Sequence, residues 1–203
     1  MKVDFEIVVI GTSTGGLKAL QLLLSALPAE FPLPVAIVQH RGKDSQIGLC
    51  EFLRRSSKLE LIEPEDKEPI LPNRVYLAPR DYHLLIENGA FALSTDAPVA
   101  YARPSIDVLF ESAADEYRDK TIGVIMTGAN HDGARGLHSI KSRGGLALVE
   151  NPDSAACREM PDAAIALTKV DAILPLAEIA QLLVELTQSS VAETGLRAGQ
   201  VAV

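Results

Sequence analysis

Apolar residues along this chain gather into short β-branched runs that alternate with longer amphipathic stretches. Four of the short runs are almost continuously apolar: residues 6–10, 34–39, 121–127 and 146–150. Such runs are typical of parallel strands whose two faces are both covered. The stretches that repeat apolar residues at helical spacing are 17–27, 45–56, 105–117 and 132–142. This alternation predicts an α/β fold: a doubly wound, mainly parallel sheet with helices on both faces.

The middle and the end of the chain depart from this alternation. Residues 82–94 hold two strand-like segments around Asn88-Gly89, which predicts an antiparallel β-hairpin excursion from the main sheet. A short helix is expected at 162–167, and a last amphipathic helix at 176–186. Residues after this helix are small and polar without periodicity. We therefore expect one domain over 1–187 and a loosely ordered C-terminal tail over 188–203.

Composition excludes several classes of function. Nineteen basic against 27 acidic residues give a net charge of −8, so the basic face of a nucleic-acid-binding protein is not expected. The two cysteines, Cys50 and Cys157, are too few for a disulfide framework or a four-thiolate zinc site. No apolar run reaches the ~20 residues that span a bilayer. We expect a cytoplasmic protein with no membrane insertion, no metal and no cofactor. Its oligomeric state cannot be read from these features.

Polar side chains follow three of the predicted parallel strands. Ser13 lies in the turn GTSTGG after the first strand, His40 ends the second, and Asp132 follows the strand at 121–127. Because the carboxyl ends of parallel strands share one edge of the sheet, we expect these three side chains to meet there. An imidazole activates a serine hydroxyl by taking its proton, and a buried carboxylate orients the imidazole. The glycines after Ser13 would let backbone N–H groups face a developing oxyanion.

Each of these residues also has a simpler interpretation. Ser13 or Thr12 could cap the helix at 17–27, and Asp132 could cap the helix that it precedes. His131 competes with His40 as the base, but adjacent residues at a helix start rarely face each other, so His40 is preferred. His83 alternates within a hairpin strand and is expected to be structural.

A nucleotide site is the alternative for the GTSTGG turn. A dinucleotide-binding loop would need glycine where Ser13 stands, and an acidic residue where His40 ends the second strand. No Gly-Lys-Ser/Thr sequence of a phosphate loop follows either. A nucleotide-binding or non-catalytic interaction module on the same fold is thus the second hypothesis, behind a serine hydrolase.

The motifs taken together resemble a known family. They are GTSTGG, VQH, RPSIDVLF, MTGANHDGARGL and EMP, in that order. This set is similar to the catalytic domain of the chemotaxis protein-glutamate methylesterases of the CheB type, over residues 5–186. The resemblance implies hydrolysis of glutamate methyl esters on the cytoplasmic helices of chemoreceptors, and in many members deamidation of receptor glutamines. It also implies that Ser13 is the nucleophile, His40 the base and Asp132 the orienting carboxylate.

The resemblance further assigns the oxyanion hole to the backbone N–H groups of Thr14 and Ala129. Ala129 departs from the better-known members, which have methionine there, so the pocket lining should differ while the backbone donor remains. His131 stands where asparagine is frequent. The familiar members also carry an N-terminal receiver domain, whereas the catalytic motif here begins at residue 11; we therefore expect a stand-alone esterase.

Substrate contacts are expected from residues beside these motifs. The RPSIDVLF segment has two interpretations: a helix start capped by Ser105 with Asp107 in its first turn, or a wall of the substrate cleft. In the second, Arg103 and Ser105 bind substrate, and Arg41 lies at the cleft mouth next to His40. Long-range attraction to a Glu-rich receptor region should be weak, because the protein is itself acidic.

Overall fold

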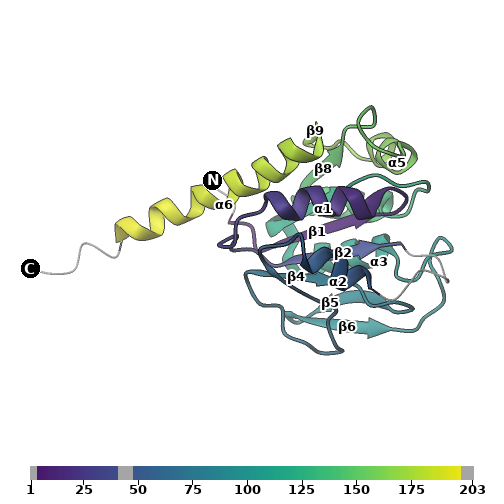
Figure 1. The fold of residues 1–203 in the computed structure, drawn as a ribbon, viewed down its shortest axis with the longest axis horizontal. Helices are drawn as coiled ribbons and strands as arrows, with labels where there is room; N and C mark the ends of the chain where they lie inside the picture. Colours follow the sequence, from purple (N-terminus) through teal and green to yellow (C-terminus); the bar gives the residue numbers. More distant parts are fainter. Residues whose placement is uncertain (1–3, 41–47, 198–203) are drawn as a thin grey trace, which may run out of the picture.

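A computed structural model describes residues 4–40 and 48–197 of the chain, with the arrangement shown in Figure 1. Within these ranges, seven parallel strands form one sheet in the order β3-β4-β2-β1-β7-β8-β9. The strands are β1 (Ile7–Thr12), β2 (Val35–Gln39), β3 (Glu60–Ile62), β4 (Arg74–Leu77), β7 (Thr121–Ile125), β8 (Leu146–Glu150) and β9 (Ala172–Leu174). The predicted parallel sheet is confirmed.

Helices cover both faces of this sheet. One face carries α1 (Gly16–Ala26), α2 (Leu49–Arg54) and α6 (Leu176–Arg197). The other carries α3 (Ile106–Tyr117), α4 (Ala134–Ser142) and α5 (Glu159–Leu167). On that second side, β5 (His83–Glu87) and β6 (Ala90–Ser94) pair antiparallel and pack against α3. The doubly wound fold and its hairpin excursion are therefore both as expected.

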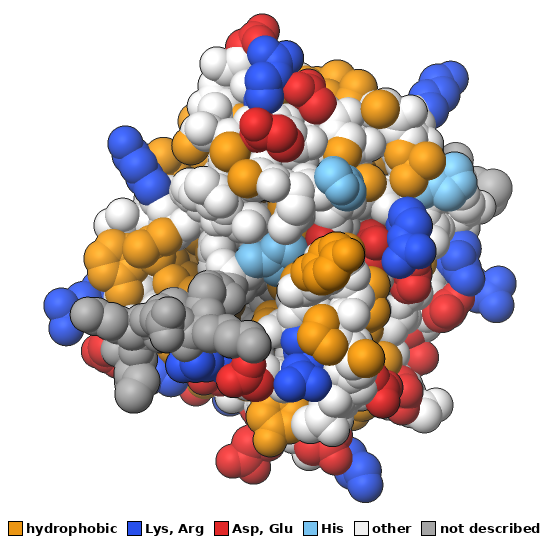
Figure 2. Space-filling model, turned by 90° about the vertical axis from the view of Figure 1, so that its right-hand side faces the viewer, with side chains coloured by type: hydrophobic (Ala, Val, Ile, Leu, Met, Phe, Trp, Pro, Cys, Tyr) orange, Lys and Arg blue, Asp and Glu red, His pale blue; other side chains and the backbone are white. Residues whose placement is uncertain are grey.

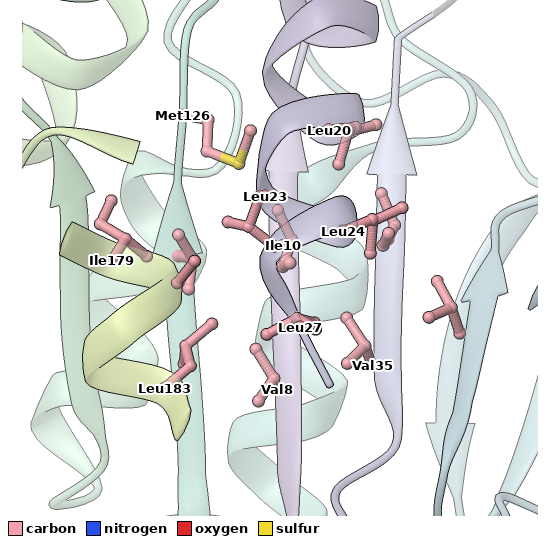
Figure 3. Close-up of a cluster of buried hydrophobic side chains, with 14 of the residues drawn as sticks. Val8, Ile10, Leu20, Leu23, Leu24, Leu27, Val35, Met126, Ile179 and Leu183 are labelled. Carbon is pink, nitrogen blue, oxygen red and sulfur yellow. The ribbon is translucent and has the colours of Figure 1, made fainter. Parts of the chain in front are cut away.

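The alternation of side chains along β1 explains why both faces need a cover. Val8 and Ile10 belong to the apolar cluster under α1 and α6, whereas Ile7 and Val9 belong to the cluster under α3 and α4. Figure 3 shows the first cluster, with the leucines of α1 facing Val8 and Ile10. All four β1 side chains are fully buried. Each such burial is worth about 1.5–3 kcal/mol relative to exposure.

The start of α5 and the end of α6 differ most from the expected helix boundaries. α5 starts at Glu159, ahead of Pro161, because the first turn of a helix needs no N–H group from a proline. α6 continues to Arg197, beyond the expected end at Leu186, because backbone hydrogen bonding can outlast an apolar stripe. The loose attachment of residues 188–203 stays a prediction, and the expected start of a helix at Ser45 lies outside the described residues.

β1 is the central strand and positions the candidate site. Ile10 pairs with Ile37 of β2 on one side and with Val124 of β7 on the other. The chain therefore leaves β1 toward β2 and later returns to its opposite side, which makes a topological switch point at the carboxyl ends. Figure 2 shows that side of the molecule face on, with a histidine side chain in a hollow near its middle.

Gly136 offers a test of how closely α3 and α4 pack. A Cβ atom there would lie 2.5 Å from Phe110 Cβ and 3.1 Å from the backbone Cα of Asp107. Gly136→Ala should therefore lower the free energy of unfolding by about 1–3 kcal/mol through overpacking. This sign is opposite to the gain of roughly 1 kcal/mol that alanine brings in an open helix. Urea unfolding would measure it.

The matched control is His138→Ala, at an exposed position of the same helix. It should change stability by no more than about 0.5 kcal/mol. A Gly136→Ala protein that is more stable than the parent would show that the two helices do not meet as described.

Candidate active site

The structure brings two of the three expected catalytic side chains into contact and places the third in the same cleft. His40 Nε2 lies 2.7 Å from Asp132 Oδ2. Ser13 and His40 both line a cleft of about 610 Å³, a volume typical of ligand sites. No hydrogen bond joins Ser13 Oγ to His40 within the described part of the chain.

Asp132 is held by donors on every side. Its Oδ1 accepts bonds from Ser105 Oγ at 2.8 Å and Asp107 N at 3.0 Å, and its Oδ2 accepts one from Ile106 N at 2.7 Å. Burial alone would raise the pKa of Asp132, but the bonds from His40 and from these backbone groups outweigh it and lower the pKa. The carboxylate is therefore ionised at neutral pH. Asp132 caps α3 and not α4, the helix that follows it in the chain. The interpretation that Asp132 caps the following helix was therefore wrong.

Asp107 makes the reverse connection from α3 to α4. Its Oδ1 accepts bonds from Gly133 N at 2.9 Å and Gly136 N at 2.8 Å, at the start of α4. Its Oδ2 accepts a bond from Arg135 Nε at 3.0 Å. The N-terminus of α3 is thus capped by Asp132, which precedes α4, and the N-terminus of α4 is capped by Asp107, which lies in α3. This exchange fixes the position of Asp132 relative to both helices.

The turn that carries Ser13 is anchored by its backbone. Ser13 N donates to Thr127 O at 2.9 Å, and Ser13 O accepts a bond from Gln39 Nε2 at 2.8 Å. Gly15, with φ of +82°, is the N-cap of α1, and no side chain caps it. Thr12 Oγ1 donates to Thr127 O instead. The alternative that Ser13 or Thr12 caps α1 was therefore wrong, and the Ser13 hydroxyl is left for the cleft.

One backbone donor follows Ser13 in the chain, and a second precedes Asn130. The N–H groups of Thr14 and Ala129 meet no acceptor within the described residues. Thr14 lines the cleft, and Ala129 precedes Asn130, which also lines it. The arrangement can supply hydrogen bonds to an oxygen of a bound molecule, as an oxyanion hole requires.

The residues expected to bind substrate have different positions. Arg41 lies outside the described residues. Arg103 lines the cleft, but its Nη1 donates to Thr95 O at 2.7 Å and Asp96 O at 3.0 Å, so it braces the loop before α3. Ser105 is fully buried behind Asp132, which differs from the expected place in the cleft wall. It sits at the N-cap of α3, yet its hydroxyl donates to Asp132 and not back to its own helix.

The other histidines have the expected positions. His83 is buried, with Nε2 at 3.1 Å from Ala97 O and Nδ1 accepting a bond from Ser105 N at 3.2 Å, so it has a structural role. His131 is exposed, and His40 rather than His131 meets Asp132.

The described residues contain no group of His, Cys, Asp and Glu side chains that could hold a metal ion. Among their helices, none is long and apolar enough to cross a membrane.

Sequence reasoning missed three side chains that build the site. Gln39 ties the ends of β1 and β2 together, since its Nε2 donates to both Ser13 O and His40 O. Thr127 Oγ1 donates to Thr14 O at 2.8 Å. Asn130 Nδ2 lies 3.0 Å from His40 Nδ1. All three stand within the VQH and MTGANHDG motifs, so their adjacency to predicted site residues was the available signal.

Comparison with known proteins places this arrangement in a family. The family model described as CheB methylesterase matches residues 8–183. The structure is similar to the crystal structure of the Thermotoga maritima CheB methylesterase catalytic domain, with a TM-score of 0.85 and 37% identity. That match covers 91% of this chain and 100% of the other. The chain belongs to the CheB methylesterase family.

Curated relatives carry the same two activities in their names. A protein of Anaeromyxobacter dehalogenans named protein-glutamate methylesterase/protein-glutamine glutaminase 2 is 42% identical over 90% of this chain and 54% of its own length. A Leptospira interrogans protein, whose name gives these activities in provisional form, is 45% identical over 93% of this chain and 98% of its own length. This chain therefore spans about half of the first relative and nearly all of the second.

The cap that Asp132 gives α3 predicts a pH-dependent stability. In Asp132→Asn, an amide NH₂ group faces hydrogen-bond donors in either orientation, so the free energy of unfolding at pH 7 should fall by about 2 kcal/mol or more. Folding lowers the pKa of Asp132, so the ionised carboxylate stabilises the folded state at pH values above its unfolded pKa of about 3.9. This stabilisation is lost as the pH falls through the pKa of Asp132 in the folded state.

Urea unfolding of parent and variant at neutral and at acid pH would measure this. The stability difference between the two proteins should shrink as the pH falls through the folded pKa. An equal difference at both pH values would contradict the role of the Asp132 charge.

Proposed function

We propose that this protein is a serine hydrolase that removes methyl esters from glutamate side chains of chemoreceptors. Ser13 would be the nucleophile, His40 the base and Asp132 the carboxylate that orients it. The contact of 2.7 Å between His40 and an ionised Asp132, beside Ser13 in one cleft, is the observation that carries this proposal. Family membership and the names of the relatives support the choice of substrate.

We propose that Nδ1 is the nitrogen of His40 that reacts. Nε2 faces Asp132, so Nδ1 is the nitrogen left to take a proton from Ser13. As Ser13 Oγ attacks the ester carbonyl, its proton moves to Nδ1, and the N–H groups of Thr14 and Ala129 stabilise the oxyanion. Nδ1 then protonates the departing methoxide, which releases methanol and leaves an acyl-enzyme. A water molecule that loses a proton to the same nitrogen hydrolyses the acyl-enzyme and regenerates Ser13.

The same steps would deamidate glutamine. The side-chain amide of glutamine differs from the ester only in its leaving group, which departs as ammonia after protonation by His40. Both reactions pass through the same glutamyl acyl-enzyme and end in a glutamate side chain. The double name of the relatives supports this second activity of the proposed site.

The cleft rim carries a candidate contact for the receptor helix. Val99 and Ala102 exchange two backbone hydrogen bonds around a tight turn that holds Ala100 and Tyr101, both at positive φ. Tyr101 lines the cleft and is fully exposed, although left-handed backbone is unfavourable for a bulky residue. An exposed aromatic ring on a hydrogen-bonded turn is suited to an interface anchor. We propose that Arg103 braces this loop, and that Arg41 and the ring of Tyr101 meet the protein substrate.

Replacing the nucleophile tests the proposed chemistry. Ser13→Ala should reduce methanol release from a methylated receptor by at least ~1000-fold, because no alcohol remains to form the acyl-enzyme. It should also abolish covalent labelling by a fluorophosphonate. Ser25→Ala, at an exposed position of α1, is the control and should keep parental activity and labelling. A Ser13→Ala protein as active as the parent would exclude the proposed mechanism.

Replacing Tyr101 separates substrate binding from chemistry. Tyr101→Ala should raise KM for a methylated receptor roughly 5- to 30-fold, the range of a 1–2 kcal/mol interface contact. Its kcat/KM for a small soluble methyl ester should stay at the parental value, because the ring is fully exposed at the rim of the cleft. Tyr101→Phe should keep most of the receptor affinity. Equal losses on both substrates would show that the turn serves catalysis and not docking.

A further inference from the structure

Asn130 is bonded at both ends of its carboxamide. Its Oδ1 accepts a bond from Asp132 N at 3.1 Å, and its Nδ2 lies 3.0 Å from His40 Nδ1. A backbone N–H group can only donate, so Oδ1 must face Asp132 and the NH₂ group must face His40. Nδ1 is then the acceptor, which leaves the ring proton on Nε2, where it points to Asp132 Oδ2. The segment 130–132 therefore holds the His40 ring from two sides.

This arrangement gives Asn130 and Ser13 the same partner. The proposed reaction needs Nδ1 to accept the Ser13 proton, and the lone pair of an imidazole nitrogen accepts one hydrogen bond at a time. Within the described residues, that bond comes from Asn130, and Ser13 Oγ makes none to His40. The two donors must therefore exchange before Ser13 can react.

We propose that Asn130 is a positioning residue for His40. It holds the tautomer with an unprotonated Nδ1 before substrate binds, and it gives up its hydrogen bond to that lone pair when Ser13 reacts. This inference rests on the proposed function for its catalytic meaning. The energy barrier to this exchange is small compared with the barrier to rotating a misplaced ring, because one neutral hydrogen bond replaces another.

The hydrogen bond from Asn130 forms only with the neutral His40 ring, because a protonated Nδ1 has no lone pair to accept it. Among the described residues, the charged groups around His40 are Asp132, bonded to Nε2, and Arg80, Asp81 and Arg103 in the lining of the same cleft. These groups stay the same in Asn130→Ala, so a shift in the pH profile of that variant reports on the carboxamide.

Asn130→Asp is the sharpest test, because it keeps the size of the side chain and an oxygen for Asp132 N. It replaces the donor to Nδ1 by a carboxylate, which favours the protonated ring. The acid limb of the kcat/KM profile for methanol release should move up by at least ~1 pH unit, a roughly tenfold loss of activity on that limb. Asn130→Ala should move it in the same direction by less. His131→Ala, at the exposed neighbouring position, should leave the profile unchanged.

A second measurement works without any activity. ¹⁵N NMR of the substrate-free parent should show His40 with an unprotonated Nδ1 and a protonated Nε2, and Asn130→Ala should change the Nδ1 signal by removing its hydrogen bond. A proton on Nδ1 in the parent, or a folded Asn130→Asp protein with an unmoved acid limb, would overturn the inference. An inactive parent with the expected NMR signals would instead count against the proposed function alone.

Discussion

The exchange of helix caps between Asp107 and Asp132 is the interaction on which the site depends most. Asp132 accepts a backbone N–H group at the start of α3, the helix that contains Asp107. Asp107 in turn accepts backbone N–H groups at the start of α4, the helix that follows Asp132. An ionised carboxylate at a helix N-terminus satisfies donors that would otherwise be buried without partners. Because Asp132 is fixed in this way, it can lower the energy of a charged His40 without itself moving. Removing either cap would disturb both helices and the candidate base together.

The parallel sheet supplies the second constraint. β1 lies between β2 and β7, so the turns that carry Ser13, His40 and Asp132 emerge side by side although they are far apart along the chain. Gln39 and Thr127 then tie these turns to one another through backbone carbonyls. The candidate site is thus built on the rigid ends of three neighbouring strands, with the loop of Tyr101 as one wall.

Much of this could be predicted from the sequence. The continuous apolar runs predicted the buried strands, and the polar residues after them predicted where a site would form. The Asn88-Gly89 turn predicted the hairpin, because a two-residue turn with positive φ needs such residues. The end of α6 was missed, since its last turns carry no apolar stripe. Ser105 was expected in the cleft, because a sequence shows that a hydroxyl lies near a helix start but not which way it points.

The sequence by itself determined the class of fold and the set of chemical groups at one sheet edge, because both follow from periodicity and chain order. Only the tertiary structure decided how those groups meet. It turned Nε2 of His40 to Asp132, placed Asn130 on Nδ1 and put Ser105 behind the carboxylate. Such choices depend on the rotamers and backbone positions of segments that touch only after folding. A residue pattern along one chain contains no direct record of those contacts.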